Sequence, residues 1–530
     1  MRLKALGISC AALTVVAVVA APRVFADHDP SDWGLFAQNQ LKAHAWTLFG
    51  IVDPLDESEL GPFTDPDSVS AIKLASPLHA TLVSKATHTS GDMIAMWPDD
   101  EHPTHLYVCD EAGGDPSIQR VDLSQPPASN ATTIVTGMAE CDPIRRTAWG
   151  TIVAGEESST GGWYELMNPQ SIVSPIAITN RTTGATTDPR LVKRQAVGQL
   201  AFEGQVILAD GTMYYGDELA PGGAAPGGNA GGSIYKFVPA HPLTTHTTIT
   251  NPADSPFAAG TIYGLKVGIA SNNGQGAEIG TGKWTEVNKA GTGVTDASGN
   301  IDLRTAQKLQ KFSGYYRPED MDLDPLAFQE HEIRFCWAAT GRMSNGGGSE
   351  VETDNIFGEV MCIHDDETTD VSFPTGTQPI VTRFISGSSQ AAMFDNLAFQ
   401  PHTGNLVVLE DLGSLSVVED GATKTRGDDI WMCLPDGDDD DVQSDGCVRI
   451  ASLRDTDSEP TGFIFTASGR SAFVNLQHRG TTPNAGALLK ITGFSAHPHR
   501  RDFDRDGLDF FHWHGHKPNW GWGWVPKKSW

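Results

Sequence analysis

Four acidic residues occupy the same place in a recurring pattern: Glu203, Glu319, Asp395 and Glu459. Each precedes a short apolar segment, a turn with Gly, Pro or Asp, and a second apolar segment, a pattern typical of β-hairpins. If equivalent hairpins surround one axis, these carboxylates converge. Converging carboxylates repel one another and are costly to desolvate unless a cation lies among them. The pattern therefore predicts a metal site; the alternative is that the four residues cap surface turns.

The chemistry predicted for this site depends on metal ions. Oxygen donors suit hard cations, so we expect calcium, with iron or manganese as companions. The chain has no Gly-x-Ser-x-Gly, His-Glu-x-x-His or Cys-x-x-Cys motif. A metal-based mechanism is therefore favoured over a nucleophilic triad.

Repeated hairpins with long, variable insertions are typical of a β-propeller. Strand–turn–strand patterns run from about residue 70 to residue 495, with no sustained helical period, so the predicted class is all-β. Residues 35–50 favour a short helix. We expect an N-terminal segment over residues 27–66, a propeller over 67–495 and an irregular tail over 496–530.

The N-terminus predicts export. Residues 1–26 combine a basic start, an apolar run and a small residue, Ala26, before Asp27, which is the pattern of a Sec-type signal peptide. The protein is then periplasmic or extracellular. With 37 Lys and Arg against 66 Asp and Glu, its net charge of −29 disfavours nucleic acids and anionic membranes as partners. The same charge favours cation binding or a saline environment.

Six cysteines follow the predicted cleavage point, and an even number in an exported chain indicates disulfides. Cys433 and Cys447 flank an acidic loop and form the first expected pair. Cys336 and Cys362 end nearby predicted strands and form the second. The remaining two cysteines, Cys109 and Cys141, either pair with each other or stay free as metal ligands.

The C-terminal tail carries two further metal-binding patterns. Residues 502–507 have a D-x-D-x-D-G spacing that suits calcium, but the twelfth position is Trp513, so the EF-hand match is incomplete. Three histidines alternate with aromatic residues or glycine over residues 512–516 and favour a transition metal. The alternatives are a solvated turn and an aromatic tail without a ligand.

Several motifs, in one shared order over about residues 140–480, resemble the PhoX family of secreted alkaline phosphatases. Residues 316–319 (YRPE) resemble its Arg-Pro-Glu element, and residues 147–157 (TAWGTIVAGEE) resemble its Trp-Gly-Thr strand that ends in paired glutamates. Residues 395–411 resemble its Asp-Asn-Leu hairpin that ends in Glu-Asp, and residues 459–478 resemble its last blade.

The resemblance implies a six-bladed propeller with an iron–calcium cluster on its axis that hydrolyses phosphomonoesters, so the expected partner is a small phosphate ester. Arg317 would bind the phosphate oxygens, as its planar fork of donors allows. The metal ligands it implies are Glu203, Glu319, Asp395 and Glu459, joined by Glu156 or Glu157. The supporting residues it implies are Asn396, Glu410 and Asp411.

One departure from the family concerns its metal-binding cysteine. Cys141 lies in a bulkier turn, ECDPIRR, that is one residue longer than the family's. If Cys141 is bonded to Cys109, it is no iron ligand, and the neighbouring Asp142 could supply an oxygen to a calcium-only site. Two functions therefore stay open: a metal-dependent phosphatase, or a calcium-stabilised propeller without catalysis that binds a surface or a partner.

Overall fold

The structure is a computed structural model. It describes residues 35–222, 230–245, 247–268, 278–329, 332–341, 357–365, 378–412, 416–419, 422–436, 442–478 and 486–496. The predicted signal peptide and the tail beyond residue 496 lie outside these residues. None of the helices described is long and apolar enough to cross a membrane.

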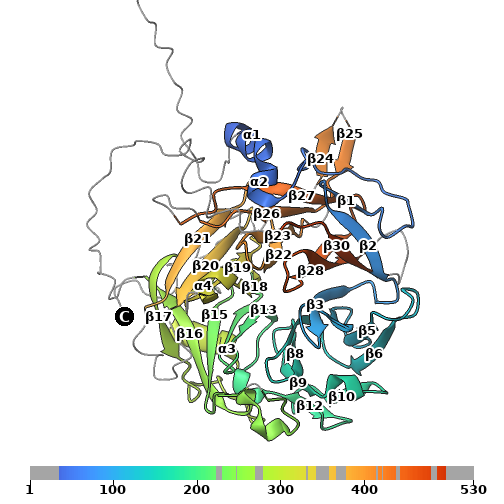
Figure 1. Ribbon diagram of the computed structural model, residues 1–530. Coiled ribbons are helices and arrows are strands. Elements are labelled where there is room, and N and C mark those ends of the chain that lie inside the picture. The colour runs from blue at the N-terminus through green and yellow to red at the C-terminus, as the bar shows by residue number, and fades with distance from the viewer. Residues whose placement is uncertain are drawn as a thin grey trace, which may run out of the picture.

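The described strands form six blades around one axis, which confirms the predicted all-β propeller (Figure 1). Each blade begins with its innermost strand and continues outward through neighbours that pair antiparallel, except for one parallel pair at the edge of the first blade. The first blade contains β3 (Gly91–Trp97), β4 (His105–Asp110), β5 (Ile118–Asp122) and β6 (Ala131–Thr136), with β10 (Ile176–Asn180) and β11 (Ala185–Thr186) at its edge. The second contains β7 (Cys141–Arg146), β8 (Thr151–Glu156), β9 (Trp163–Met167) and β12 (Leu191–Lys193).

The third and fourth blades join along their outer strands into one nine-stranded sheet. The third contains β13 (Phe202–Ile207), β14 (Met213–Asp217), β15 (Ile234–Pro239), β16 (Gly260–Val267) and β17 (Gly280–Glu286). The fourth contains β18 (Pro318–Leu323), β19 (Ile333–Ala339), β20 (Glu359–Asp365) and β21 (Ile380–Ser386). Strands β17 and β21 pair over Gly280 and Thr281.

The last two blades each receive a strand from the N-terminal region. The fifth contains β22 (Phe394–Phe399), β23 (Leu406–Glu410), β26 (Asp429–Cys433), β27 (Cys447–Leu453) and β1 (Ile72–Leu74). The sixth contains β28 (Glu459–Phe465), β29 (Ser471–Gln477), β30 (Ala487–Thr492) and β2 (His79–Ser84). A separate hairpin is formed by β24 (Ser416–Glu419) and β25 (Ala422–Thr425). Because β1 and β2 pair with strands near the other end of the chain, they tie the ring closed.

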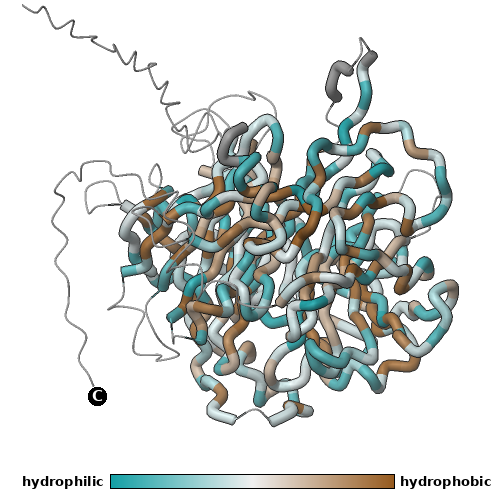
Figure 2. Tube along the Cα trace, turned by 45° about the horizontal axis from the view of Figure 1, so that its top comes forward, coloured by the Kyte–Doolittle hydropathy of each residue, from teal (hydrophilic) through white to brown (hydrophobic). Residues whose placement is uncertain are grey.

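The hydrophobic core lies between the blades. One apolar cluster fills each seam; the seam of the first two blades, for example, packs Met93 and Tyr107 against Ile144 and Ile152. Apolar stretches alternate with hydrophilic ones along the chain, and several outer loops are hydrophilic (Figure 2). Packing between sheets, rather than hydrogen bonds, therefore holds most neighbouring blades together.

Helices are few and peripheral. The helix predicted over residues 35–50 forms as two, α1 (Leu35–Ala43) and α2 (Ala45–Phe49), and α1 packs near β27. The other two are α3 (Leu303–Gln310) and α4 (Pro325–Gln329). The side chain of Asp302 caps α3 by accepting a hydrogen bond from the Thr305 backbone N–H (2.9 Å).

The six innermost strands form a closed ring, in the order β3, β7, β13, β18, β22, β28 and back to β3. They approach closely: a Cβ on Gly204 of β13 would lie 2.0 Å from the backbone nitrogen of Met321 in β18. Arg145 of β7 reaches past β13 to Asp320 of β18, with Nη2 3.1 Å from Oδ1. Side chains at matching positions of these strands therefore lie near one axis.

Candidate metal centre

Every innermost strand carries an acidic residue at its start. The residue is the second of its strand in five blades and the first in the sixth; the set is Asp92, Asp142, Glu203, Glu319, Asp395 and Glu459. All six are largely withdrawn from solvent and interact electrostatically with one another, including across the ring: Asp92 with Asp395, and Glu203 with Asp395. The four carboxylates singled out in the sequence thus come together, and Asp92 and Asp142 complete the ring.

A repeated backbone feature aims these carboxylates. In each blade the pairing of the innermost strand with its neighbour shifts register at or just after the acidic residue, as between Cys141 and Ile144. A bulge of this kind redirects the local side chains. In three blades the residue before the innermost strand is also left-handed: φ is 51° at Glu140, 50° at Arg317 and 53° at Met393.

A second set of polar residues borders this ring. In five blades the residue just after the second strand donates its backbone N–H to the carbonyl of the residue just before the innermost strand, at 2.8–3.1 Å. These donors are Glu111, Glu157, Glu218, Thr340 and Asp411. The bond fixes each of them beside the start of an innermost strand.

In four blades two consecutive acidic residues lie at the end of the second strand, and the two members of each pair have different surroundings. The first member is buried with a cationic or imidazole partner; these contacts are Asp110 with His88, Glu156 with Arg181, Asp217 with Arg304 and Glu410 with Arg426. The second member belongs to the bordering set, as Glu157 and Asp411 do. Asp92, Glu111 and Glu218 were not predicted from the sequence, although the paired acids at residues 110–111 and 217–218 were a usable signal.

The structure brings Glu157, rather than Glu156, into the centre. Both Glu156 carboxylate oxygens are used elsewhere: Oε1 accepts from Ala139 N–H (2.9 Å) and Oε2 from Gly162 N–H (2.8 Å), while Arg181 contacts both. Glu410 similarly accepts hydrogen bonds from Ala392 N–H, Asp429 N–H and the Trp431 indole. Glu156 and Glu410 therefore support the backbone around the centre from outside it.

The tightest grouping of carboxylates lies on one side of the ring. Ligand oxygens of Asp92, Glu111 and Asp142 lie within 4.8 Å of one another, and so do those of Asp142, Glu157 and Glu203. Asp142 belongs to both groups. The two groups therefore form a continuous chain of oxygens that crosses three blades.

Burial and mutual repulsion disfavour charge on these carboxylates. Burial first, and then repulsion from Glu111, raises the pKa of Glu157 to about 9. Burial first, and then repulsion from Asp411, raises the pKa of Asp395 to about 7. Burial is also the largest cause of the raised pKa at Asp92, Asp142, Glu203, Glu319 and Glu459. Without added positive charge, the centre cannot be fully ionised at neutral pH.

Arg317 supplies part of that positive charge. Its Nε lies 2.7 Å from Glu218 Oε1, and its Nη2 lies 3.0 Å from Glu319 Oε1 and 3.7 Å from Asp411 Oδ2. The negative charge of Glu319 is the main cause of the raised pKa of Arg317. Among the described residues Nη1 has no hydrogen-bond or ion-pair partner. The residue predicted to bind phosphate thus lies at the edge of the carboxylate ring.

Asn396 orients Asp395. Its Nδ2 donates to Asp395 Oδ2 at 3.2 Å, and its Oδ1 accepts from the Gly462 backbone N–H. The amide therefore links the starts of two neighbouring innermost strands, β22 and β28. The supporting role of Asn396 in a metal site stays a prediction.

The donor set fits hard cations. Asp92 Oδ1 and Asp142 Oδ1 have no hydrogen-bond partner among the described residues. Both residues are also only 3% exposed, so bulk water does not reach these oxygens. Buried oxygens without a partner are rare in proteins, and a bound cation is one way to satisfy them. All the converging ligand atoms are carboxylate oxygens, which calcium prefers.

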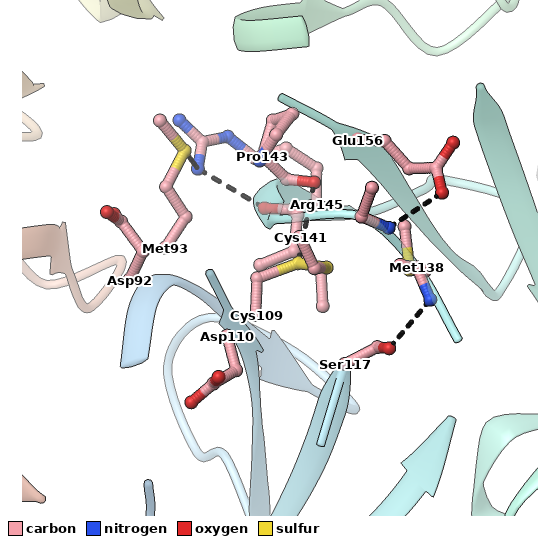
Figure 3. Close-up of a disulfide and its surroundings, with 12 residues drawn as sticks. Asp92, Met93, Cys109, Asp110, Ser117, Met138, Cys141, Pro143, Arg145 and Glu156 are labelled. Carbon is pink, nitrogen blue, oxygen red and sulfur yellow. Dashed lines mark hydrogen bonds between the residues drawn. A yellow bond between two sulfur atoms is a disulfide. The ribbon is translucent and has the colours of Figure 1, made fainter. Parts of the chain in front are cut away.

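The six cysteines that follow the predicted cleavage point are paired in three disulfides. The predicted pairs Cys433–Cys447 and Cys336–Cys362 are confirmed. Cys141 is bonded to Cys109 (Figure 3). Of the two alternatives left open by the sequence, a disulfide or a free metal ligand, the structure therefore has the disulfide, and the Cys141 sulfur is no thiolate ligand. The oxygen ligand Asp142, next to Cys141, is in the centre instead.

A family model described as alkaline phosphatase PhoX matches residues 133–480. The chain belongs to this family. The match confirms the resemblance and includes Arg317 and five of the six ring carboxylates. Asp92, on β3, and Glu111, which follows β4, lie before the matched residues, and only the structure places them beside the other carboxylates.

No curated protein matches the chain. Among solved structures, a gluconolactonase from Xanthomonas campestris is similar, with 11% identity and a TM-score of 0.36 over 84% of this chain and 100% of the other. The PQQ domain of a pyranose dehydrogenase from Coprinopsis cinerea has 9% identity and a TM-score of 0.35 over 81% and 98%. Scores this low carry no argument about activity.

Proposed function

We propose that this protein is an exported, metal-dependent phosphatase that hydrolyses small phosphomonoesters at the axial centre. Its membership of the PhoX family supports a phosphatase function. The observation that carries the finer proposal is the convergence of ring carboxylates beside a partly exposed guanidinium, that of Arg317. The disulfides agree with export to an oxidising compartment.

The ring carboxylates would hold calcium, with iron as a companion at an oxygen-only position. When bound, such cations neutralise the carboxylates, attract the ester's oxygens and activate the attacking water. An acidic pocket accepts a phosphate only after cations reverse its sign. The proposed ligands are Asp92, Asp142, Glu203, Glu319, Asp395 and Glu459, with Glu111 and Glu157.

Arg317 would bind and orient the phosphoryl group. Glu218 and Glu319 hold its Nε and Nη2, which fixes the plane of the guanidinium. Nη1 is left to donate to a phosphate oxygen, and such charge-assisted bonds strengthen as negative charge develops during transfer. Asn396 would keep Asp395 in its ligating orientation.

Hydrolysis of p-nitrophenyl phosphate by the full-length, calcium-loaded protein tests this proposal. We expect turnover that is lost on chelation and reduced about 100-fold or more in Arg317→Ala. Calcium affinity should stay equal or rise in that variant, because a positive charge leaves the ring. The matched control is Arg190→Ala, which removes a half-buried arginine that pairs with Asp188 away from the centre. Because the proposed centre includes iron as a companion, the assay is repeated with iron added. Protein loaded with both metals that shows no turnover would contradict the proposal.

The second candidate is a calcium-stabilised propeller without catalysis. It is favoured by the ion pairs of Arg317, which already engage Glu218, Glu319 and Asp411. In that case Arg317→Ala lowers thermal stability, and the wild-type protein binds calcium but hydrolyses no phosphate ester. The same assay therefore separates the two functions.

A further inference from the structure

The disulfide Cys109–Cys141 joins two blades that share no backbone hydrogen-bond ladder. Cys109 lies on β4 of the first blade and Cys141 opens β7 of the second, and these strands belong to different sheets. The two Cα atoms are 5.1 Å apart, and both side chains are fully buried in the apolar seam (Figure 3). The bond is therefore a covalent link across a seam that side-chain packing otherwise holds.

A proposed ligand follows each of these cysteines closely. Glu111 is two residues after Cys109, and Asp142 is the residue after Cys141. Their carboxylate oxygens lie within 4.8 Å of each other and of Asp92. One bond thus fixes both sides of the seam at the point where three carboxylates from two blades meet.

Repulsion acts against this arrangement. The carboxylates of Asp92, Glu111 and Asp142 disfavour charge on one another, and they belong to blades that could separate at the seam. Glu111 is also held by the bond from its backbone N–H to the Ser90 carbonyl and by the hydrogen bond that its carboxylate accepts from Gln477 Nε2. The Cys109–Cys141 disulfide begins two residues before Glu111 and directly opposes separation of the first and second blades.

The other two disulfides have a different setting. Cys336 is the register partner of Cys362 on β19 and β20, and Cys433 is the partner of Cys447 on β26 and β27. Both bonds therefore join strands that backbone hydrogen bonds already hold. Of the disulfides described, Cys109–Cys141 alone connects two blades.

We infer that the Cys109–Cys141 disulfide is a positioning element that holds Glu111 and Asp142 together as ligands of one divalent cation. The inference rests on the metal centre of the proposed function. The oxygen donors indicate a hard cation, and calcium is the probe for the test. Cys109 and Cys141 touch neither substrate nor cation in this role.

The first test compares calcium affinity in two disulfide-free variants, measured by competition with a chromophoric chelator. We expect Cys109→Ala/Cys141→Ala to weaken one calcium site about 10- to 100-fold, the range typical when support for a metal ligand is removed. The matched control, Cys433→Ala/Cys447→Ala, should bind calcium like the wild type. Thermal unfolding in chelator measures how far each variant is destabilised independently of calcium.

The second test uses wild-type protein and remains decisive if the variant does not fold. Because coupling between two events is reciprocal, calcium should favour the oxidised form of Cys109–Cys141 by the same factor by which the bond favours calcium. The protein is equilibrated in dithiothreitol redox buffers with and without calcium, and each pair is followed by alkylation and mass spectrometry. We expect a shift of about tenfold or more for Cys109–Cys141 and none for Cys433–Cys447.

The outcomes separate this inference from the proposed function. Wild-type protein that binds no calcium overturns both. Wild-type protein that binds calcium, with equal affinity in Cys109→Ala/Cys141→Ala and no selective protection of that disulfide, overturns this inference alone. Equal weakening in both disulfide variants also overturns it, since that result reports general destabilisation.

Discussion

At the scale of single residues, carboxylates in this molecule have two kinds of neighbour. Glu156 and Glu410 are each compensated by an arginine and by backbone N–H groups. Asp142 and Glu203 have mainly other carboxylates around them, and burial raises their pKa further. A buried charge without a compensating partner is costly, so carboxylates of the second kind are the ones that a bound cation would stabilise.

Replacing one ring carboxylate should weaken cation binding while it relieves repulsion. We expect Glu203→Gln to weaken calcium binding about tenfold or more, because a charged donor in contact with Asp142 and Glu157 is lost. In chelator, the same variant should unfold at a temperature equal to or above that of the wild type. Calorimetric titration and thermal unfolding measure these effects.

The matched control is Glu57→Gln, which removes an exposed carboxylate far from the ring in the sequence. It should leave calcium affinity within about twofold of the wild type, because exposed charges interact weakly through solvent. An equal loss of calcium affinity in both variants would mean that overall charge, not the ring, attracts the cation.

At the scale of elements, the centre is built by one backbone arrangement repeated around the axis. Each innermost strand has a register shift near its start, and in five blades a hydrogen bond from the residue after the second strand brings a second side chain beside the first. The innermost strands must also approach closely. Gly204 permits this, because any side chain there would meet the backbone of Asp320 and Met321.

Adding one methyl group at this approach should destabilise the ring. In Gly204→Ala the new Cβ would lie 2.0 Å from the Met321 nitrogen, so β13 and β18 must move apart. We expect a loss of about 3 kcal/mol of unfolding free energy, the upper range for overpacking. Chemical denaturation measures it, with Gly222→Ala as the control, since a Cβ at Gly222 meets no atom within 4 Å. Equal stability of the two variants would contradict the close approach.

Part of this arrangement was predictable from the sequence. Glu203, Glu319, Asp395 and Glu459 stood out because a clear hairpin follows each. Asp92 did not, since its hairpin lies before the region that resembles a known family, and Asp142 was considered only as a substitute for Cys141. The pairing of β2 with β30 and the division of roles within Glu156–Glu157 depend on contacts between distant segments, which local patterns do not encode.

At the scale of the whole molecule, the propeller concentrates negative charge at its axis. The chain has a net charge of −29, and six blades each point an acidic residue towards one centre. Two features offset the repulsion between these residues: the buried apolar side chains in the seams between blades, and strands β1 and β2, which close the ring. Bound cations should then stabilise the whole ring, because they bind the folded state alone.

Stability should depend on pH in opposite ways with and without calcium. The raised pKa values of Asp395 (about 7) and Glu157 (about 9) mean that the folded, metal-free protein holds protons that the unfolded chain releases. Its stability therefore falls as pH rises from the unfolded values, 3.8 for Asp395 and 4.5 for Glu157, through those folded values. We expect the unfolding temperature in chelator to drop by about 5 °C or more between pH 6 and pH 9.

With saturating calcium, the ring carboxylates are ionised in both states, and the unfolding temperature should vary little over the same range. Differential scanning fluorimetry with and without chelator makes the comparison. Parallel pH profiles under the two conditions would show that other groups cause the dependence.

The most direct measurement is the anomalous scattering of crystals grown with a calcium-mimicking lanthanide such as terbium. The account predicts peaks on the propeller axis, within bonding distance of carboxylates from several of the residues Asp92, Asp142, Glu203, Glu319, Asp395 and Glu459. Peaks confined to the outer acidic loops, with the axial carboxylates unligated, would contradict it.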